Sequence, residues 1–451
     1  MNVMKMLLII MLIAAGLAPI SQAQVLRDVP QLPQQLPQLP ETLEQLRENA
    51  KLETSKLPRY PGHPVLTSIE SATTHLTEVL PAVFEITDAQ GNLLLREVSV
   101  EDGWRALERE WLMAIEADEV QLLQKLPIEV LGQRELAALE LTVVRFRVPA
   151  HYDSRQALSE LLPEFMQATL ARQHIYFAQD SGTSAEDLPA NSNSGVACDD
   201  PLTLGAIDTR IDTGVSYFAE ADIHQRSFLD DEFAQPLAHG TAIAGLWLGK
   251  GEELQPLVPN ARLLAAAVFY EHNSLSQGAP VSALIEALDW LVAEGVRVIN
   301  MSLTGPDNAI LRVALQRAHA SGTIIVAAAG NAGPAAPPLY PAAYDKVIAV
   351  TAVDVQQRVY PWANRGRHIE YAALGVDVTT VRGGGGLTAE SGTSMAAPVV
   401  SALLSCVLAD SAEARETSIA DKLSPYLQDL GAPGPDPIFG RGLLTPGQPP
   451  L

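Results

Sequence analysis

Residues 296–330 read VRVINMSLTGPDNAILRVALQRAHASGTIIVAAAG, and this stretch decides the fold class. Both of its ends are short apolar runs rich in Val and Ile, which is typical of buried strands. Between them, residues 308–320 carry apolar side chains at helical spacing. A strand, a helix and a second strand within so short a stretch predict two parallel strands joined by a crossover helix.

The same alternation continues on both sides of this stretch. LTLGAI (202–207), ARLLAAAVF (261–269) and KVIAVTAV (346–353) are further strand candidates, and residues 281–292 form one apolar helical face. We therefore expect an α/β domain over residues 198–445, with a parallel sheet covered by helices on both faces. In such a sheet, reactive groups gather just beyond the carboxyl ends of the strands.

Three polar residues stand at strand ends or helix starts. Asp208 follows LTLGAI, His239 opens HGTAIAG, and Ser394 lies in SGTSMAAP at the start of an apolar helix, where we expect Pro398 to fall in the tolerant first turn. Taken singly, each has an ordinary structural explanation as a cap or a buried polar residue. Together they supply what acyl transfer needs, because a serine hydroxyl needs an imidazole base and the imidazole needs an orienting carboxylate.

Four blocks in one order carry a family resemblance. AIDTRID, HGTAIAG, AAAGNAGP and SGTSMAAP resemble the aspartate, histidine, oxyanion and serine blocks of the subtilisin-like serine peptidases, the subtilases. The resemblance covers about residues 198–445 and implies an endopeptidase that hydrolyses polypeptides through an acyl-enzyme. It implies that Asp208 orients the imidazole, that His239 is the general base and then the acid, and that Ser394 is the nucleophile.

The resemblance also implies an oxyanion hole and a substrate segment. Asn331 in GNAGP matches the side-chain donor to the oxyanion, and the backbone N–H of Ser394 would be the second donor. INMSLTGP (299–306) resembles the family's substrate-binding segment, and FGRGLL (439–444) resembles its closing motif. Within the substrate segment, the main chain of four residues would pair with an extended peptide: Ser302, Leu303, Thr304 and Gly305.

The sequence also departs from the family pattern. Arg210 and Thr304 stand where many relatives have glycine, and Ala242 stands where many have a second histidine. A competing DTG begins at Asp212, and a second SGTS at 181–184 is a decoy because the polar AEDLP follows it. These departures leave a rival reading, a catalytically silent subtilase fold that binds a peptide or partner in the same cleft.

The amino end indicates export. Residues 1–23 combine one early cation, a 15-residue apolar run and small residues at 21 and 23, as a cleaved signal peptide does. An uncleaved anchor is the alternative, although the run is shorter than the roughly 20 residues that a spanning helix needs. We expect no stable membrane span after signal removal, and a secreted or periplasmic protein. Residues 24–62, rich in Pro and Gln, predict a semi-rigid linker, and residues 446–451 a short tail.

Charge and cysteine content limit the partners and cofactors. The formal net charge of −23 repels phosphate backbones, so we expect no nucleic acid partner. The only cysteines, Cys198 and Cys406, are either bonded to each other or two buried free thiols. We expect no cofactor. Calcium is possible as a structural ion, but the acids of FLDDEF (228–233) have no EF-hand spacing and are expected to form a solvated loop.

Residues 63–180 predict a small accessory α+β domain. Over 119–180 it resembles the propeptide of subtilases, which implies a ferredoxin-like fold that acts as intramolecular inhibitor or chaperone. Its tail would lie in the cleft and be cut within about 179–197, since 181–197 form a linker accessible to cleavage. A permanent structural or partner-binding domain is the alternative. The expected elements are strands within 82–100 around a turn at 89–92, a helix over 104–125, strands over 127–131 and 139–148, a helix over 154–170 and a strand over 174–178.

Overall fold

The structure is a computed structural model that describes residues 83–116, 119–178, 195–273, 276–409 and 418–447. The expected export signal, the Pro- and Gln-rich linker and the SGTS decoy at 181–184 lie outside the described residues. So does most of the linker over 181–197. All described residues belong to one unit, Glu70–Leu451.

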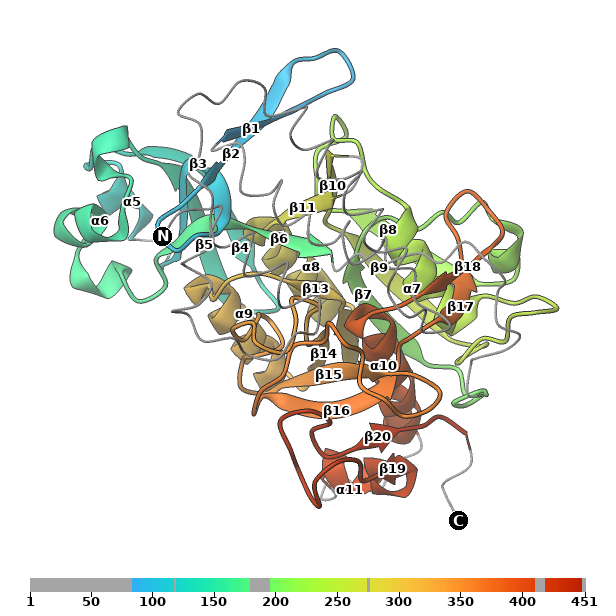
Figure 1. The fold of residues 1–451 in the computed structure, drawn as a ribbon. Helices are drawn as coiled ribbons and strands as arrows, with labels where there is room; N and C mark the ends of the chain where they lie inside the picture. The colour runs from blue at the N-terminus through green and yellow to red at the C-terminus, as the bar shows by residue number, and fades with distance from the viewer. Residues whose placement is uncertain (1–82, 117–118, 179–194, 274–275, 410–417, 448–451) are drawn as a thin grey trace, which may run out of the picture. The chain divides into compact units, whose positions relative to one another are not determined.

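The carboxyl-terminal part is built on a nine-stranded sheet in the order β19-β20-β16-β15-β14-β12-β7-β9-β8 (Figure 1). Neighbouring strands from β20 to β8 are parallel, and only β19 runs antiparallel to its neighbour. The expected parallel α/β sheet is therefore confirmed. Its strands are β7 (Thr203–Asp208), β8 (Asp222–Ser227), β9 (Arg262–Ala267), β12 (Val298–Met301), β14 (Ile324–Ala328), β15 (Val347–Val353), β16 (Ile369–Leu374), β19 (Leu427–Gln428) and β20 (Leu443–Leu444).

Helices cover both faces of this sheet. One face packs against α7 (Ala238–Leu248) and α10 (Thr393–Ala409) in a single apolar cluster, and the other against α8 (Val281–Ala293) and α9 (Ala309–Ala320) in a second. The expected helix over 308–320 is confirmed as α9. The Asn308 side chain caps its amino end by accepting hydrogen bonds from Ile310 N and Leu311 N. Further elements of this part are η3 (Ser216–Phe218), the hairpin of β17 (Val378–Val381) and β18 (Leu387–Glu390), α11 (Ile419–Leu423) and η4 (Ser424–Tyr426).

A disulfide joins Cys198, ahead of β7, to Cys406 near the end of α10. The alternative of two free thiols is therefore wrong. The bond connects residues 208 positions apart and fastens the start of the sheet domain to its central helix.

The amino-terminal part has its own sheet. From β3 to β6 the chain runs strand, helix, two strands, helix, strand, with the strand order β4-β5-β3-β6 and antiparallel neighbours throughout, which is a ferredoxin-like arrangement. The hairpin β1–β2 precedes it and pairs with β3. The elements are β1 (Val83–Thr87), β2 (Leu93–Ser99), β3 (Arg105–Ala114), α5 (Val120–Leu123), β4 (Glu129–Leu136), β5 (Leu141–Arg147), η1 (Ala150–Tyr152), α6 (Arg155–Leu161), η2 (Glu164–Met166) and β6 (Ala171–Ala178).

The helix expected over 104–125 is wrong, because β3 occupies residues 105–114 and, of the described residues there, only the four of α5 are helical. β3 has strand neighbours on both edges and buries side chains on both faces, so its apolar residues do not alternate. A register shift between Ala106 and Trp111, with Arg109 at a φ of 59°, further breaks the period of two. The helix expected over 154–170 is shorter than predicted: α6 ends at Leu161, two residues before Pro163.

Candidate active site

Asp208 and His239 are in direct contact. Asp208 is the last residue of β7, and His239 lies in the first turn of α7; both are buried. Asp208 Oδ1 lies 2.7 Å from His239 Nδ1 and also accepts from Thr209 N. Because an ionised carboxylate can only accept, this contact places the ring proton on Nδ1 and leaves Nε2 as the basic nitrogen.

A close approach of two backbones fixes His239 beside Asp208. Gly240 N donates to Thr209 Oγ1 at 2.7 Å, which ties the start of α7 to the residue after β7. A Cβ at Gly240 would collide with the carbonyl oxygen of Thr209. Glycine at this position therefore lets the helix that carries the imidazole sit directly against the strand that carries the carboxylate.

The competing acid of the DTG motif is not the partner of His239. Asp212 Oδ2 accepts from Gly384 N at 2.9 Å, and its Oδ1 accepts from Gly214 N at 3.2 Å. Asp212 N donates to Thr241 Oγ1 at 2.8 Å. Asp212 thus links α7 to the loop between β17 and β18.

Ser394 is the second residue of α10 and is fully buried. Its Oγ lies 3.5 Å from the carbonyl oxygen of Ser302, and Ser302 Oγ donates to Ser394 O at 3.0 Å. The second contact has a cause in the sequence. Pro398 has no N–H for the carbonyl four residues before it, which is that of Ser394, so this carbonyl accepts from Ser302 instead.

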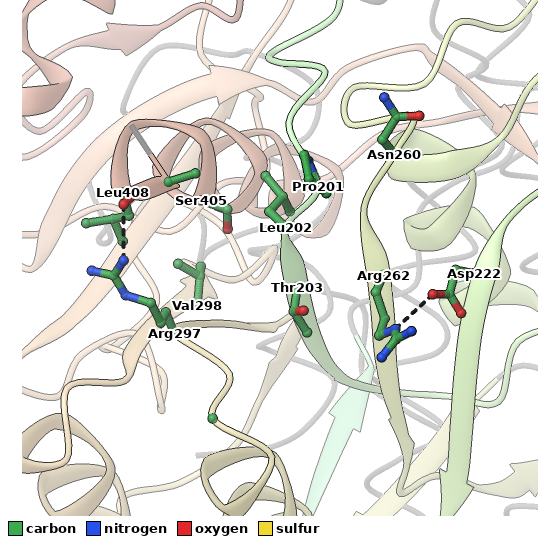
Figure 2. A pocket seen from close by; sticks show the side chains of 12 residues that line it. Pro201, Leu202, Thr203, Asp222, Asn260, Arg262, Arg297, Val298, Ser405 and Leu408 are labelled. Atoms are coloured by element: carbon green, nitrogen blue, oxygen red, sulfur yellow. Dashed lines mark hydrogen bonds and ion pairs between the residues drawn. The ribbon is translucent and has the colours of Figure 1, made fainter. Parts of the chain in front are cut away.

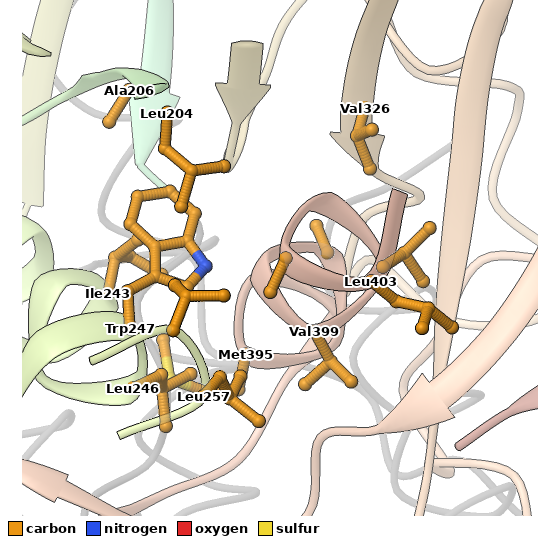
Figure 3. Packing of buried hydrophobic residues seen from close by; sticks show 14 of the residues in the cluster. Leu204, Ala206, Ile243, Leu246, Trp247, Leu257, Val326, Met395, Val399 and Leu403 are labelled. Atoms are coloured by element: carbon orange, nitrogen blue, oxygen red, sulfur yellow. The ribbon is translucent and has the colours of Figure 1, made fainter. Parts of the chain in front are cut away.

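The expectation for Pro398 itself was wrong. α10 begins at Thr393, so Pro398 lies inside the helix and not in its first turn. Its own carbonyl accepts from Trp247 Nε1 of α7 at 2.8 Å. Figure 3 shows Ile243, Leu246 and Trp247 of α7 beside Met395, Val399 and Leu403 of α10. The proline thus helps to join the helix that carries His239 to the helix that carries Ser394.

Asn331 is held by the residue that precedes Ser394. Its Oδ1 accepts from Thr393 N and from Thr393 Oγ1, each at 3.0 Å, and Thr393 Oγ1 accepts from Gly330 N. Two donors on Oδ1 fix which way the amide points. The amide nitrogen faces Gly392, where a Cβ would lie 2.8 Å from Nδ2.

The four residues expected to bind substrate have different partners. Leu303 and Thr304 form β13 and pair antiparallel with Ala178 and Phe177 of β6, from the amino-terminal part. Ser302 instead contacts Ser394, as described above. Gly305 pairs with Tyr340, with N–H···O distances of 2.8 and 3.1 Å.

The sequence did not predict the second strand that pairs with β6, which is β11 (Ser276–Pro280). β10 (Tyr270–Asn273) and β11 form a hairpin, and β11 pairs antiparallel with β6 from Gly278 to Pro280. β6 therefore runs between β11 and β13 as the middle of three strands (Figure 1). SQGAP has neither alternation nor β-branched residues, so only the turn signal of its glycine was available.

One cavity lies away from these residues. It has a volume of about 480 Å³ and lies at the amino ends of β7, β9 and β12, opposite the end that carries Asp208. Figure 2 shows its two arginines turned to other partners, Arg262 to Asp222 and Arg297 to the carbonyl of Leu408. It contains no residue expected at the active site.

Among the described residues, no group of three or more His, Cys, Asp or Glu is placed so that it could hold a metal ion. The acids expected to be solvated, Asp230, Asp231 and Glu232, are exposed. In the same described part of the chain, no helix is long and apolar enough to cross a membrane.

Known proteins resemble this chain over its carboxyl-terminal half. The family model described as the subtilase family matches residues 180–442. Subtilisin DY of Bacillus licheniformis is 34% identical over 213 residues, which are 46% of this chain and 75% of that protein. Minor extracellular protease Epr of Bacillus subtilis (strain 168) is 29% identical over 245 residues, 52% of this chain but only 37% of Epr.

A solved structure resembles a larger share of the chain. The crystal structure of fervidolysin from Fervidobacterium pennivorans, a keratinolytic enzyme related to subtilisin, superposes with a TM-score of 0.61. The superposition covers 82% of this chain and 64% of fervidolysin at 17% identity, so this likeness concerns the fold alone. The family match extends over more than half of the sequence, and the chain therefore belongs to the subtilase family, as a subtilisin-like serine peptidase.

Proposed function

We propose that this chain is an exported serine endopeptidase that cuts polypeptides through Asp208, His239 and Ser394. The observation that carries the proposal is the 2.7 Å contact of His239 Nδ1 with Asp208, on a helix packed against the one that carries Ser394. This contact leaves Nε2 able to remove a proton from a hydroxyl.

The reaction follows the acyl-transfer sequence. His239 Nε2 takes the proton of Ser394 Oγ as that oxygen attacks the carbonyl carbon of the substrate, and a tetrahedral intermediate forms. His239 then gives the proton to the leaving amine, and the C–N bond breaks. A water molecule then gives a proton to the same nitrogen and attacks the acyl-enzyme. As the ester bond breaks, His239 returns this proton to Ser394 Oγ and the new carboxylate is released. Asp208 stabilises the imidazolium in both halves.

Asn331 and the start of α10 would stabilise the negative oxygen of the intermediate. Thr393 holds Asn331 Oδ1, which turns Nδ2 toward Gly392. The backbone N–H of Ser394 lies in the first turn of α10, where N–H groups have no partner within the helix. Both donors would be fixed before the reaction, which is what gives such a site its effect.

The amino-terminal domain would act as an inhibitor that is cut by its own peptidase. β6 pairs with β13, the segment expected to bind an extended peptide, and Ala178 lies opposite Leu303. Ser302, the residue before Leu303, contacts Ser394, so the carboxyl end of β6 lies near the nucleophile. We place the first cut within about residues 179–197.

Two features support export. The apolar segment over 1–23 has the make-up of a signal peptide, and the Cys198–Cys406 disulfide suits an oxidising compartment. The final compartment would be the periplasm or the medium.

The test compares wild type with Ser394→Ala by intact mass and amino-terminal sequencing. Wild type should lose its signal after Ala23 and be cut within 179–197, whereas Ser394→Ala should keep the amino-terminal domain attached. Its kcat should fall by about 10⁶-fold, as is known when the serine of subtilisin is removed.

The matched control is Ser405→Ala, which removes a buried hydroxyl from the same helix that donates only to Ser401 O. This variant should be processed like wild type. Equal processing of Ser394→Ala and wild type would refute the proposed nucleophile. A wild type that is neither processed nor active would favour a silent peptide-binding protein.

A further inference from the structure

Asn331 stands at the start of a loop that has little apolar anchoring of its own. β14 ends at Ala328, and the loop that follows spans residues 331–338. Most of its side chains are exposed, namely those of Ala332, Pro334, Ala335, Pro337 and Pro338. Burial of apolar side chains therefore contributes little to the position of the Asn331 backbone, and hydrogen bonds from outside the loop have to fix it.

Asn364 supplies such hydrogen bonds. It lies in the connection between β15 and β16 and is fully buried. Its Oδ1 accepts from Ala332 N at 2.9 Å, and its Nδ2 donates to the carbonyl oxygen of Pro337 at 3.1 Å. Its backbone N donates to the carbonyl oxygen of Gly330 at 2.9 Å. One residue thus holds the backbone on both sides of Asn331 and also the far end of the loop.

The amide of Asn364 fits this loop in one orientation. Its Oδ1 faces an N–H group and its Nδ2 faces the carbonyl of a proline, so a flipped amide would set donor against donor and acceptor against acceptor. Gly330 has a φ of 107°, and a Cβ there would lie 2.7 Å from Leu339 Cδ1 and 3.3 Å from Asn364 Cγ. Glycine at position 330 therefore lets the amide approach the loop closely.

Asn331 is consequently held from two directions. Thr393 of α10 fixes its side chain through Oδ1, and Asn364 fixes the backbone that carries this side chain. A contact at Oδ1 fixes one end of the amide, and the place of Nδ2 then depends on the backbone. A donor to a developing oxyanion has to be held within about 0.5 Å of its productive position. Both supports are therefore needed to aim Nδ2.

We propose that Asn364 is a positioning residue for the oxyanion hole. It acts on the reaction by holding the backbone of Asn331, and it donates nothing to the substrate itself. The inference rests on the proposed function, because it takes Asn331 to be the oxyanion donor. The competing explanation is a purely structural role, in which Asn364 stabilises the loop without any effect that passes through Asn331.

The test is a double-mutant cycle between Asn364→Ala and Asn331→Ala, with each variant isolated after self-processing and assayed on one peptide substrate. Asn364→Ala alone should lower kcat about 10- to 100-fold, because a displacement of about 1 Å is enough for such a loss. KM should change by less than about threefold. In the Asn331→Ala background the same substitution should lower kcat by less than about threefold, because the donor that Asn364 positions is already absent.

The matched control is Asp354→Ala, in the same connection between β15 and β16. Asp354 Oδ1 accepts from Gln356 N and from Arg358 N, each at 2.9 Å, so this variant also loses two hydrogen bonds that hold a loop. It should unfold at a lower denaturant concentration than wild type and keep kcat within about twofold. Asn364→Asp is the second variant if Asn364→Ala does not fold, since it keeps the acceptor for Ala332 N. Its loss of kcat should likewise vanish in the Asn331→Ala background.

The outcomes separate this inference from the function on which it rests. An unchanged kcat in Asn364→Ala, an equal loss of kcat in the two backgrounds or a loss confined to KM would overturn the positioning role. An unchanged kcat in Asn331→Ala would overturn both the oxyanion donor and the residue that positions it. In each of these cases, casein hydrolysis that disappears in Ser394→Ala would show that the proposed peptidase stands, and its absence from wild type would overturn both proposals.

Discussion

Asn331 is the residue at which the proposed chemistry can be measured apart from binding. Replacement by alanine removes a donor to the developing oxyanion, so we expect kcat to fall by about 10² to 10³-fold, the effect known for this donor in subtilisin. KM should change by less than about threefold, since the hydrogen bond forms mainly in the transition state.

The control for this variant is Asn260→Ala, because Asn260 lies in the distant cavity and donates only to Asp199 O. It should retain full activity. If Asn331→Ala lowers the melting temperature but leaves kcat intact, Asn331 is a structural residue and the oxyanion assignment fails.

Single residues were predictable where a motif names them. AIDTRID and HGTAIAG identified Asp208 and His239, and the structure brings the two side chains into contact. The support of Asn331 by Thr393 could not be read from the sequence, because the two lie 62 positions apart. The hydrogen bond from Tyr176 to the Pro306 carbonyl was equally hidden, since an aromatic residue in a short apolar strand is usual in any core.

The start of α7 is the element whose placement matters most for the proposed chemistry. Gly240→Ala would press a methyl group against the Thr209 carbonyl and push α7 away from β7. We expect a fall in kcat/KM of about 10²-fold or more, because a displacement of about 1 Å is enough for such a loss. The free energy of unfolding should fall by about 1–3 kcal/mol from overpacking, measured by denaturant unfolding in the Ser394→Ala background.

Gly132→Ala serves as the matched control. Gly132 lies in β4 with open space around the position of a Cβ. The same substitution there should leave activity and stability within experimental error of wild type. Full activity of Gly240→Ala would show that the close approach of α7 to β7 does not position His239.

Elements were predicted well where one rule governs them. Strands β7, β12, β14 and β15 are short apolar runs buried on both faces, and α9 has both a periodic face and an Asn308 cap. The same reasoning failed for β3, because the apolar residues of a strand that is covered on both faces can have the spacing of a helix. Local pattern cannot distinguish these cases, since the difference lies in what packs against the chain.

At the scale of the whole molecule, β6 of the amino-terminal part lies between two strands of the peptidase part, β11 and β13. The α/β class follows from the order of elements, whereas the ferredoxin-like class of the amino-terminal part was predicted from the resemblance to a propeptide. The pairing of β6 with β11 and β13 joins residues more than a hundred positions apart, and no local signal predicts its register. The resemblance to a propeptide predicted that the tail of this domain lies in the cleft. It did not predict which residues of β6 pair with β11 and β13.

The central claim is that Ser394 is the nucleophile, and labelling with a fluorophosphonate tests it most directly. The hydroxyl that His239 activates should displace fluoride and form a phosphonate ester. The account predicts one adduct per processed molecule, located on Ser394 by peptide mass spectrometry, with no adduct in Ser394→Ala and far slower labelling in His239→Ala. An adduct on another residue, or none on a preparation that hydrolyses casein, would contradict it.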